Sequence, residues 1–219
     1  NSSAETMLAV DGNGVTINQI VISSGSITGS TITNARLTNA NVSTASPGQL
    51  MARLDSTTLT GTSTALTLTV TSSAYASLQV RLTGRGDDST QIVPVRMLFN
   101  SDSAANYHNA LFQSTATTLT AVESTALSNG GRIGVVAGSS AAAGSAGSIV
   151  ADINHYTSSF TKLTIAHGVS IGTFNTAGSL IPQVNGMVWN STAAITSIEL
   201  RLVAGGFVAG TRATLYGLP

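Results

Sequence analysis

The chain of 219 residues contains no cysteine, and charged residues make up only 8% of it. Without cysteine there can be neither a disulfide bridge nor a thiolate ligand for a metal. Nine basic and nine acidic residues balance one another, so the sequence offers no basic patch for nucleic acid. No apolar run approaches the ~18 residues of a membrane-spanning helix. We therefore expect no nucleic-acid partner and no insertion into a membrane.

Apolar residues nevertheless make up 42% of the sequence, and the missing charge is replaced by threonine, serine, alanine, glycine and asparagine. Disordered chains combine low hydrophobicity with high charge, which is the opposite of this composition. Threonine-rich segments separated by glycine and asparagine are typical of strands joined by tight turns. The composition predicts an all-β protein.

Between residues 15 and 42 the large aliphatic residues recur at every fifth position. Neither a helix nor a flat strand places such a pattern on one face, but a chain that bends at each repeat does. The stretch resembles pentapeptide-repeat coils, most clearly at residues 35–43. One narrow apolar line buries too little surface to fold alone, so we expect a β-structured shaft at residues 15–46, completed by two further copies around a threefold axis. The alternative is a polar linker whose spacing is fortuitous. The candidate axis residues are Ile17, Ile22, Ile27, Ile32, Leu37 and Val42.

After Pro47 and Gly48, which mark a hinge, the apolar residues alternate with polar ones. Short alternating segments separated by turns predict an antiparallel β-sandwich over residues 47–219, with a jelly roll as the first choice. We expect the apolar set of each strand to pack inward, and the strand containing Pro94 to be an edge strand. Residues 1–14 are expected to form an amino-terminal anchor. The expected strands contain residues 66–70, 78–82, 93–99, 111–112, 149–153, 163–165, 169–171, 184–188, 198–202 and 213–215.

Two stretches of this expected head stand out as long loops, at residues 114–132 and 137–147. The second contains only small, uncharged residues. It is expected either to form a mobile rim or to pack closely against another subunit.

None of the polar clusters indicates a catalytic or metal site. His108, His155 and His167 lack metal-ligand spacing, and we expect no cofactor. The tripeptide 85–87 spells Arg-Gly-Asp, the integrin-binding motif, but its many turn formers favour a hairpin turn. The oxygen-rich residues 100–106 lack the paired acids of a strong calcium loop.

The last residues of the chain, 189–198 and 206–218, resemble the carboxy-terminal ends of structural proteins from tailed bacteriophages. This resemblance implies a non-enzymatic homotrimer with an amino-terminal attachment region, a shaft and a β-sandwich head. Such a protein would be assembled in the host cytoplasm and displayed on the virion surface. Its amino-terminal end would bind other virion proteins.

Three functions remain open within this interpretation. A tail fibre or spike would attach to a host-surface glycan or receptor, through exposed aromatics such as Tyr107, Tyr156 or Trp189. A capsid decoration protein would bind at symmetry-related positions of the shell. A carbohydrate-active enzyme on the same sandwich would need two acids across a cleft, and nothing in the sequence indicates such a pair.

Overall fold

The computed structural model describes residues 51–115, 118–172 and 180–219. The expected anchor (1–14) and shaft (15–46), with all six candidate axis residues, lie outside this range and remain predictions. Every regular element in the described ranges is a β-strand. The described residues include no helix long and apolar enough to cross a membrane.

The strands form two antiparallel sheets, as the alternating pattern predicted. The smaller sheet contains, in spatial order, β2 (Ala65–Thr69), β11 (Ser197–Leu202), β4 (Ile92–Phe99) and β7 (Gly131–Ala137). The larger sheet contains, in spatial order, β1 (Ala52–Thr58), β12 (Arg212–Leu218), β3 (Ser77–Gly84), β8 (Gly147–Asn154), β9 (Lys162–Ile171), β10 (Leu180–Trp189), β5 (Tyr107–Thr115) and β6 (Thr118–Leu127).

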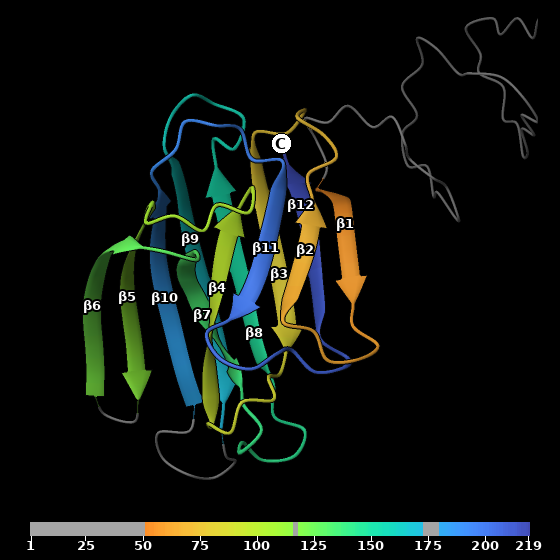
Figure 1. Cartoon of the computed structure of the whole chain (residues 1–219), viewed down its shortest axis with the longest axis vertical. Coiled ribbons are helices and arrows are strands. Elements are labelled where there is room, and N and C mark those ends of the chain that lie inside the picture. Colours follow the sequence, from red (N-terminus) through yellow and green to blue (C-terminus); the bar gives the residue numbers. More distant parts are fainter. Residues whose placement is uncertain (1–50, 116–117, 173–179) are drawn as a thin grey trace, which may run out of the picture. The chain divides into compact units, whose positions relative to one another are not determined.

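Eight of these strands have the order of a jelly roll. Strands β1-β12-β3-β8 of the larger sheet oppose β2-β11-β4-β7 of the smaller one, and the chain changes sheet at each step from β1 to β4. The hairpin β5–β6 is inserted between β4 and β7, and the hairpin β9–β10 between β8 and β11. These four inserted strands, which we call the extension, widen the larger sheet from β8 outward. Figure 1 shows β5 and β6 reaching beyond the smaller sheet on the left.

The hydrophobic core lies mainly between the two halves of the jelly roll. Leu82 of β3 and Ile149 of β8 face it from the larger sheet, and Leu200 of β11 faces it from the smaller sheet. Alternation within each strand supplies these side chains, since every second residue points inward. The jelly-roll strands therefore follow the expected pattern of an apolar inner face and a polar outer face.

The structure corrects two expectations about individual strands. Pro94 lies in β4, which pairs with both β11 and β7 and so is not an edge strand. The β11 ladder ends where Val95 pairs with Leu202, so the missing N–H of Pro94 falls just beyond it. Residues 114–132, expected as a loop, contain β6 and a turn at Asn129 and Gly130, both of which have positive φ.

The second expected loop is confirmed, because residues between Ala137 and Gly147 connect β7 to β8 without a strand. Arg85 holds this loop against the sandwich. Its guanidinium donates to the carbonyl oxygens of Ser139, Ala141 and Ala142 at 3.1, 2.8 and 2.8 Å. The loop is packed by its own chain through a cation that satisfies several carbonyl groups at once.

Candidate functional site

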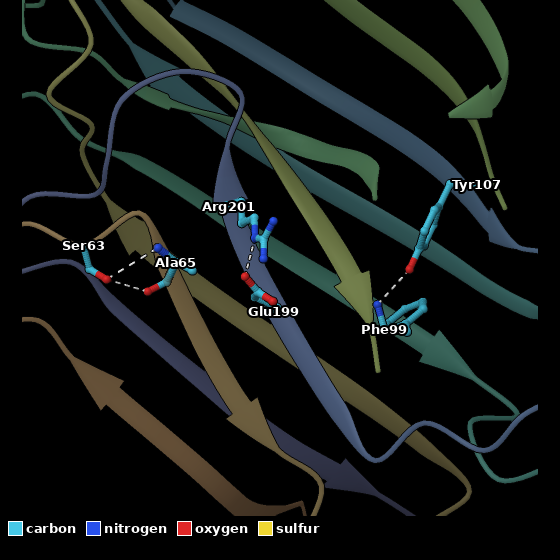
Figure 2. Close-up of polar contacts among 6 residues, drawn as sticks. All are labelled: Ser63, Ala65, Phe99, Tyr107, Glu199 and Arg201. Atoms are coloured by element: carbon cyan, nitrogen blue, oxygen red, sulfur yellow. Dashed lines mark hydrogen bonds and ion pairs between the residues drawn. The ribbon is translucent and has the colours of Figure 1, made fainter. Parts of the chain in front are cut away.

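The three aromatic residues expected to contact a ligand are buried. Tyr107, Tyr156 and Trp189 are 0%, 1% and 3% exposed, so the expectation that they line an open groove is wrong. Their rings fill the core, where a large apolar side chain contributes most to stability, and their polar atoms find partners in the same chain. The Tyr107 hydroxyl accepts a hydrogen bond from the Phe99 amide at 3.0 Å, as Figure 2 shows.

The oxygen-rich segment at residues 100–106 is occupied by hydrogen bonds. The Asp102 carboxylate accepts from the Trp189 indole at 2.7 Å and from the Asn106 amide at 2.9 Å. Burial acts to raise the pKa of Asp102, but these hydrogen bonds, with one from the Ala104 amide, outweigh it and lower the pKa. Nowhere in the described ranges do three His, Asp or Glu residues gather as they would to hold a metal ion.

The Arg-Gly-Asp tripeptide is also engaged internally. Arg85 binds the loop after β7, and the Asp87 carboxylate accepts from the Gly206 amide at 2.7 Å. A receptor would have to displace both sets of contacts. The expected hairpin turn is wrong, because the segment connects β3 of the larger sheet to β4 of the smaller sheet, and its side chains bind distant parts of the chain.

The histidines are dispersed over the head. His167 of β9 lies 3.9 Å from Asp152 of β8, measured from Nε2 to Oδ2. His155 has a positive φ and lies edge-on to Phe160, while His108 lies on β5. The structure brings no two of these histidines together.

The acidic side chains of the head are also mostly bound within the chain. Asp152 accepts a hydrogen bond from Gln79 at 2.8 Å. Glu199 pairs with Arg201 two residues along β11, and Figure 2 shows this contact on the smaller sheet.

The extension departs from the expected inside-out pattern. On β9 the inward-facing set includes Lys162 and Thr164, and the outward-facing set includes Leu163 and Ile165. On β10, Asn185 faces inward while Val184 is exposed. The expectation that the apolar set of every strand packs inward is wrong for these two strands.

A strand edge explains why polar side chains of β5 also face inward. Strand β7 ends the smaller sheet, so part of its backbone has no neighbouring strand on that side. The side chain of Asn109 on β5 supplies hydrogen bonds that a neighbouring strand would otherwise make. It accepts from the Arg132 amide and donates to the Arg132 carbonyl, at 3.2 Å each. Gln113 accepts from the Arg132 guanidinium at 3.2 Å. The inner face of the extension therefore mixes core residues such as Met187 and Trp189 with polar side chains that face backbone groups and a cation beside β7.

The outer face of the extension carries most of the exposed apolar surface of the described chain. Large apolar side chains project from all four of its strands and are 40% to 73% exposed. Residues paired across antiparallel strands lie on the same face, and the ladders place these side chains together. They are Phe112, Leu119, Leu163, Ile165, Val169, Leu180 and Val184, which we call the apolar face.

The apolar face has a clear boundary on the same sheet. Beyond His167 and Asp152 the outer surface of β8, β3 and β12 becomes polar. Arg81 lies 5.1 Å from the centre of the Tyr216 ring and donates to Gln79 at 2.7 Å. One half of the sheet therefore presents a solvated surface and the other half an apolar one.

A shallow hollow of about 320 Å³ lies in the apolar face. Gly186 and Ala110 form part of its lining, with Leu163, Ile165 and Glu123 around them. A Cβ added at Gly186 would meet no atom within 4 Å, so the glycine leaves this part of the surface open. A single carboxylate lines the hollow, which suits an apolar side chain better than a reaction that needs two acids.

Comparison of the chain with protein-family models, curated proteins and solved structures yields no match. The function of the protein is therefore inferred from the geometry of the head and the pattern of the sequence. Contiguous apolar surface of this extent marks a place where a soluble protein binds another surface. The alternating residues of β9 and β10 were visible in the sequence, but which set faces the core depends on the distant strand β7.

Proposed function

We propose that this protein is a non-enzymatic structural subunit of a tailed bacteriophage particle, assembled as a homotrimer and displayed on the particle surface as a fibre or spike for host attachment. The observation that carries the proposal is the apolar face. A head with seven large apolar side chains on one surface is suited to work in contact with other chains. The five-residue repeat before the head supports the homotrimer. The resemblance at residues 189–198 and 206–218 supports the assignment to a bacteriophage particle.

Capsid decoration is the second candidate, and the burial of Tyr107, Tyr156 and Trp189 favours it. A receptor-binding head was expected to present these aromatics for stacking on sugars, and the described head holds them in its core. A decoration protein needs no such groove, because it attaches to the shell and to its own copies.

Locating the protein in intact particles tests the proposal. We expect gold-labelled antibodies against the head to decorate the tail if the protein is a fibre, and regular positions on the shell if it is a decoration protein. Particles without label would contradict both. Cleavage of a host polysaccharide by the purified protein would contradict the non-enzymatic assignment.

The proposed threefold shaft has its own test. Replacing Ile27 and Ile32 together with Asp is expected to weaken the trimer, because an unpaired charge cannot be buried on the axis without a large penalty. The matched control places the same two charges one residue further on, at Thr28 and Thr33. Light scattering should report loss of trimer for the isoleucine variant alone, and equal behaviour of the two would remove the axial role.

A further inference from the structure

We propose that the apolar face is the contact between heads: three copies of this chain turn the outer faces of their extensions toward a common threefold axis. The inference rests on the proposed homotrimer and names the surface of the head that makes it. It concerns β9, β10, β5 and β6 and does not depend on the shaft.

The size of the apolar face indicates a partner protein. Seven roughly half-exposed large side chains present on the order of 600 Å² of surface. The largest apolar patch on a typical monomer is about 300–600 Å², and a stable interface buries roughly 800 Å² per partner. With the hollow and the intervening backbone included, the face approaches what one subunit of a stable complex buries.

The charges indicate that the partner is equally apolar. The centre of the face, around Val184 and Phe112, carries one titratable side chain, His167, which pairs with Val184 across β9 and β10. The titratable groups that face outward from the extension are His108 on β5, Glu123 on β6 and His167 on β9. A basic or acidic partner would find little to pair with, whereas a second apolar face would be complementary.

The width of the extension fits three copies. Four strands about 4.8 Å apart span about 19 Å, and the sides of an equilateral triangle of that size lie about 5.5 Å from its centre. Sheets that pack face to face are about 10 Å apart, so each contributes about 5 Å of side chains. Three extensions arranged as a triangular prism would therefore fill their shared interior with side chains and leave no channel.

This arrangement gives the edge strand β6 a partner. In a prism the middle strands β10 and β5 lie closest to the axis, and β6 of one copy meets β9 of the next at each corner. Leu119 of β6 is the most exposed large apolar residue of the described chain. At a corner it would pack against the neighbour's Ile165 or Val169, which would cover an edge that otherwise invites uncontrolled pairing.

Because the chain has no cysteine, single introduced thiols test the inference cleanly. Val184→Cys lies at the centre of the apolar face, and the matched control Thr83→Cys lies exposed on β3, in the polar half of the same sheet. The full chain would be treated with a short bis-maleimide linker and analysed on denaturing gels. We expect Val184→Cys to yield mostly joined pairs of chains, since two of three thiols around an axis can be bridged, and Thr83→Cys to stay single.

Light scattering of the untreated protein separates this inference from the proposed function. Three chains per particle with efficient linkage at residue 184 supports both. Three chains with no more linkage at 184 than at 83 overturns the inference and leaves the homotrimer intact. One or two chains per particle overturns the homotrimer and, with it, the threefold contact.

Discussion

Four of the jelly-roll strands share one continuous sheet with the extension, yet the two halves of this sheet place their exposed apolar side chains differently. In β3 and β8 the inward set is apolar and the outward set polar. In β9 and β10 the inward set contains Lys162 and Asn185 beside apolar residues such as Met187, and the outward set is mostly aliphatic. Neighbouring strands with the same geometry therefore differ in which face carries the exposed apolar residues.

The difference lies in what each half faces. Strands β3 and β8 face the side chains of the smaller sheet, so apolar residues are buried there. The inner face of the extension lies beside the edge strand β7, where the side chain of Asn109 bonds the Arg132 backbone, and Lys162 donates to carbonyls of the loop before β9. The apolar set of the extension is then left on the outer surface. The alternating pattern of a strand thus predicts two different faces, but the neighbouring elements decide which face is buried.

Truncating one leucine of the jelly-roll core and one leucine of the extension should give the largest contrast in stability. Leu200 of β11 is fully buried, so Leu200→Ala leaves a cavity and is expected to lower the free energy of unfolding by about 3 kcal/mol. Leu163 of β9 is half exposed, and Leu163→Ala is expected to cost the head fold under about 1 kcal/mol. Urea denaturation of both variants measures the difference. Equal losses would contradict the assignment of inner and outer faces.

Removing the buried lysine tests the polar inner face. The Lys162 ammonium donates to the carbonyls of Ser158 and Phe160 at 2.6 Å each. Lys162→Met leaves both carbonyls without this donor and is expected to cost about 2 kcal/mol. Arg212→Met, which removes an exposed cation from β12, is the control and should be nearly neutral. A Lys162→Met variant as stable as the unmodified protein would show that the inner face does not require the charge.

The same lysine gives a pH dependence of known sign. Burial lowers the pKa of Lys162 below its usual 10.5, so the folded chain holds this proton less tightly than the unfolded chain. Its contribution to stability therefore rises as the pH increases from the lowered pKa toward 10.5. Lys162→Met should lack this rise when unfolding is followed against pH.

Tyr107 should produce a pH dependence of the opposite sign. Burial raises its pKa from 10.0 to about 12, so its contribution is complete below pH 10 and is lost as the pH approaches 12. Tyr107→Phe leaves the Phe99 amide without its acceptor and is expected to cost about 1 kcal/mol at neutral pH. The variant should lose less stability than the unmodified protein between pH 10 and 12. An unchanged alkaline profile would exclude Tyr107 as its source.

The sequence predicted the fold class because alternation and turn residues are local signals. Residues 66–70, 78–82 and 198–202 became β2, β3 and β11, and a jelly roll was the first choice, but the order of the strands in the sheets could not be predicted. Strands β1, β6 and β7 were missed, and the expected strands at 163–165 and 169–171 are one strand, β9. The segment of β6, which contains Glu123 and several threonines, has no regular apolar alternation. An edge strand exposed on both faces leaves little pattern to detect.

The candidate site could not be predicted, since it depends on contacts between distant residues. Trp189 and Tyr107 were expected to contact a ligand. The Trp189 indole instead donates a hydrogen bond to Asp102, which lies 87 positions earlier in the chain. The apolar face combines residues from four strands. It can be recognised only once packing against β7 shows which face of the extension is buried. Apart from His167, Lys162 is the only titratable residue on β9. Its presence among the alternate residues of β9 indicated that this set does not face an ordinary apolar core.

Two glycines provide the smallest and most local test of the comparison. A Cβ added at Gly186 of the extension would have no atom within 4 Å, whereas a Cβ at Gly134 of β7 would lie 2.7 Å from the Ile149 side chain in the core. Gly186→Ala should therefore raise the unfolding free energy by about 0.5 kcal/mol, because it restricts only the unfolded chain. Gly134→Ala should lower it by about 1–3 kcal/mol through overpacking. A loss for Gly186→Ala that grew with protein concentration in thermal unfolding would contradict this expectation and would show that the added methyl group meets another copy at the hollow.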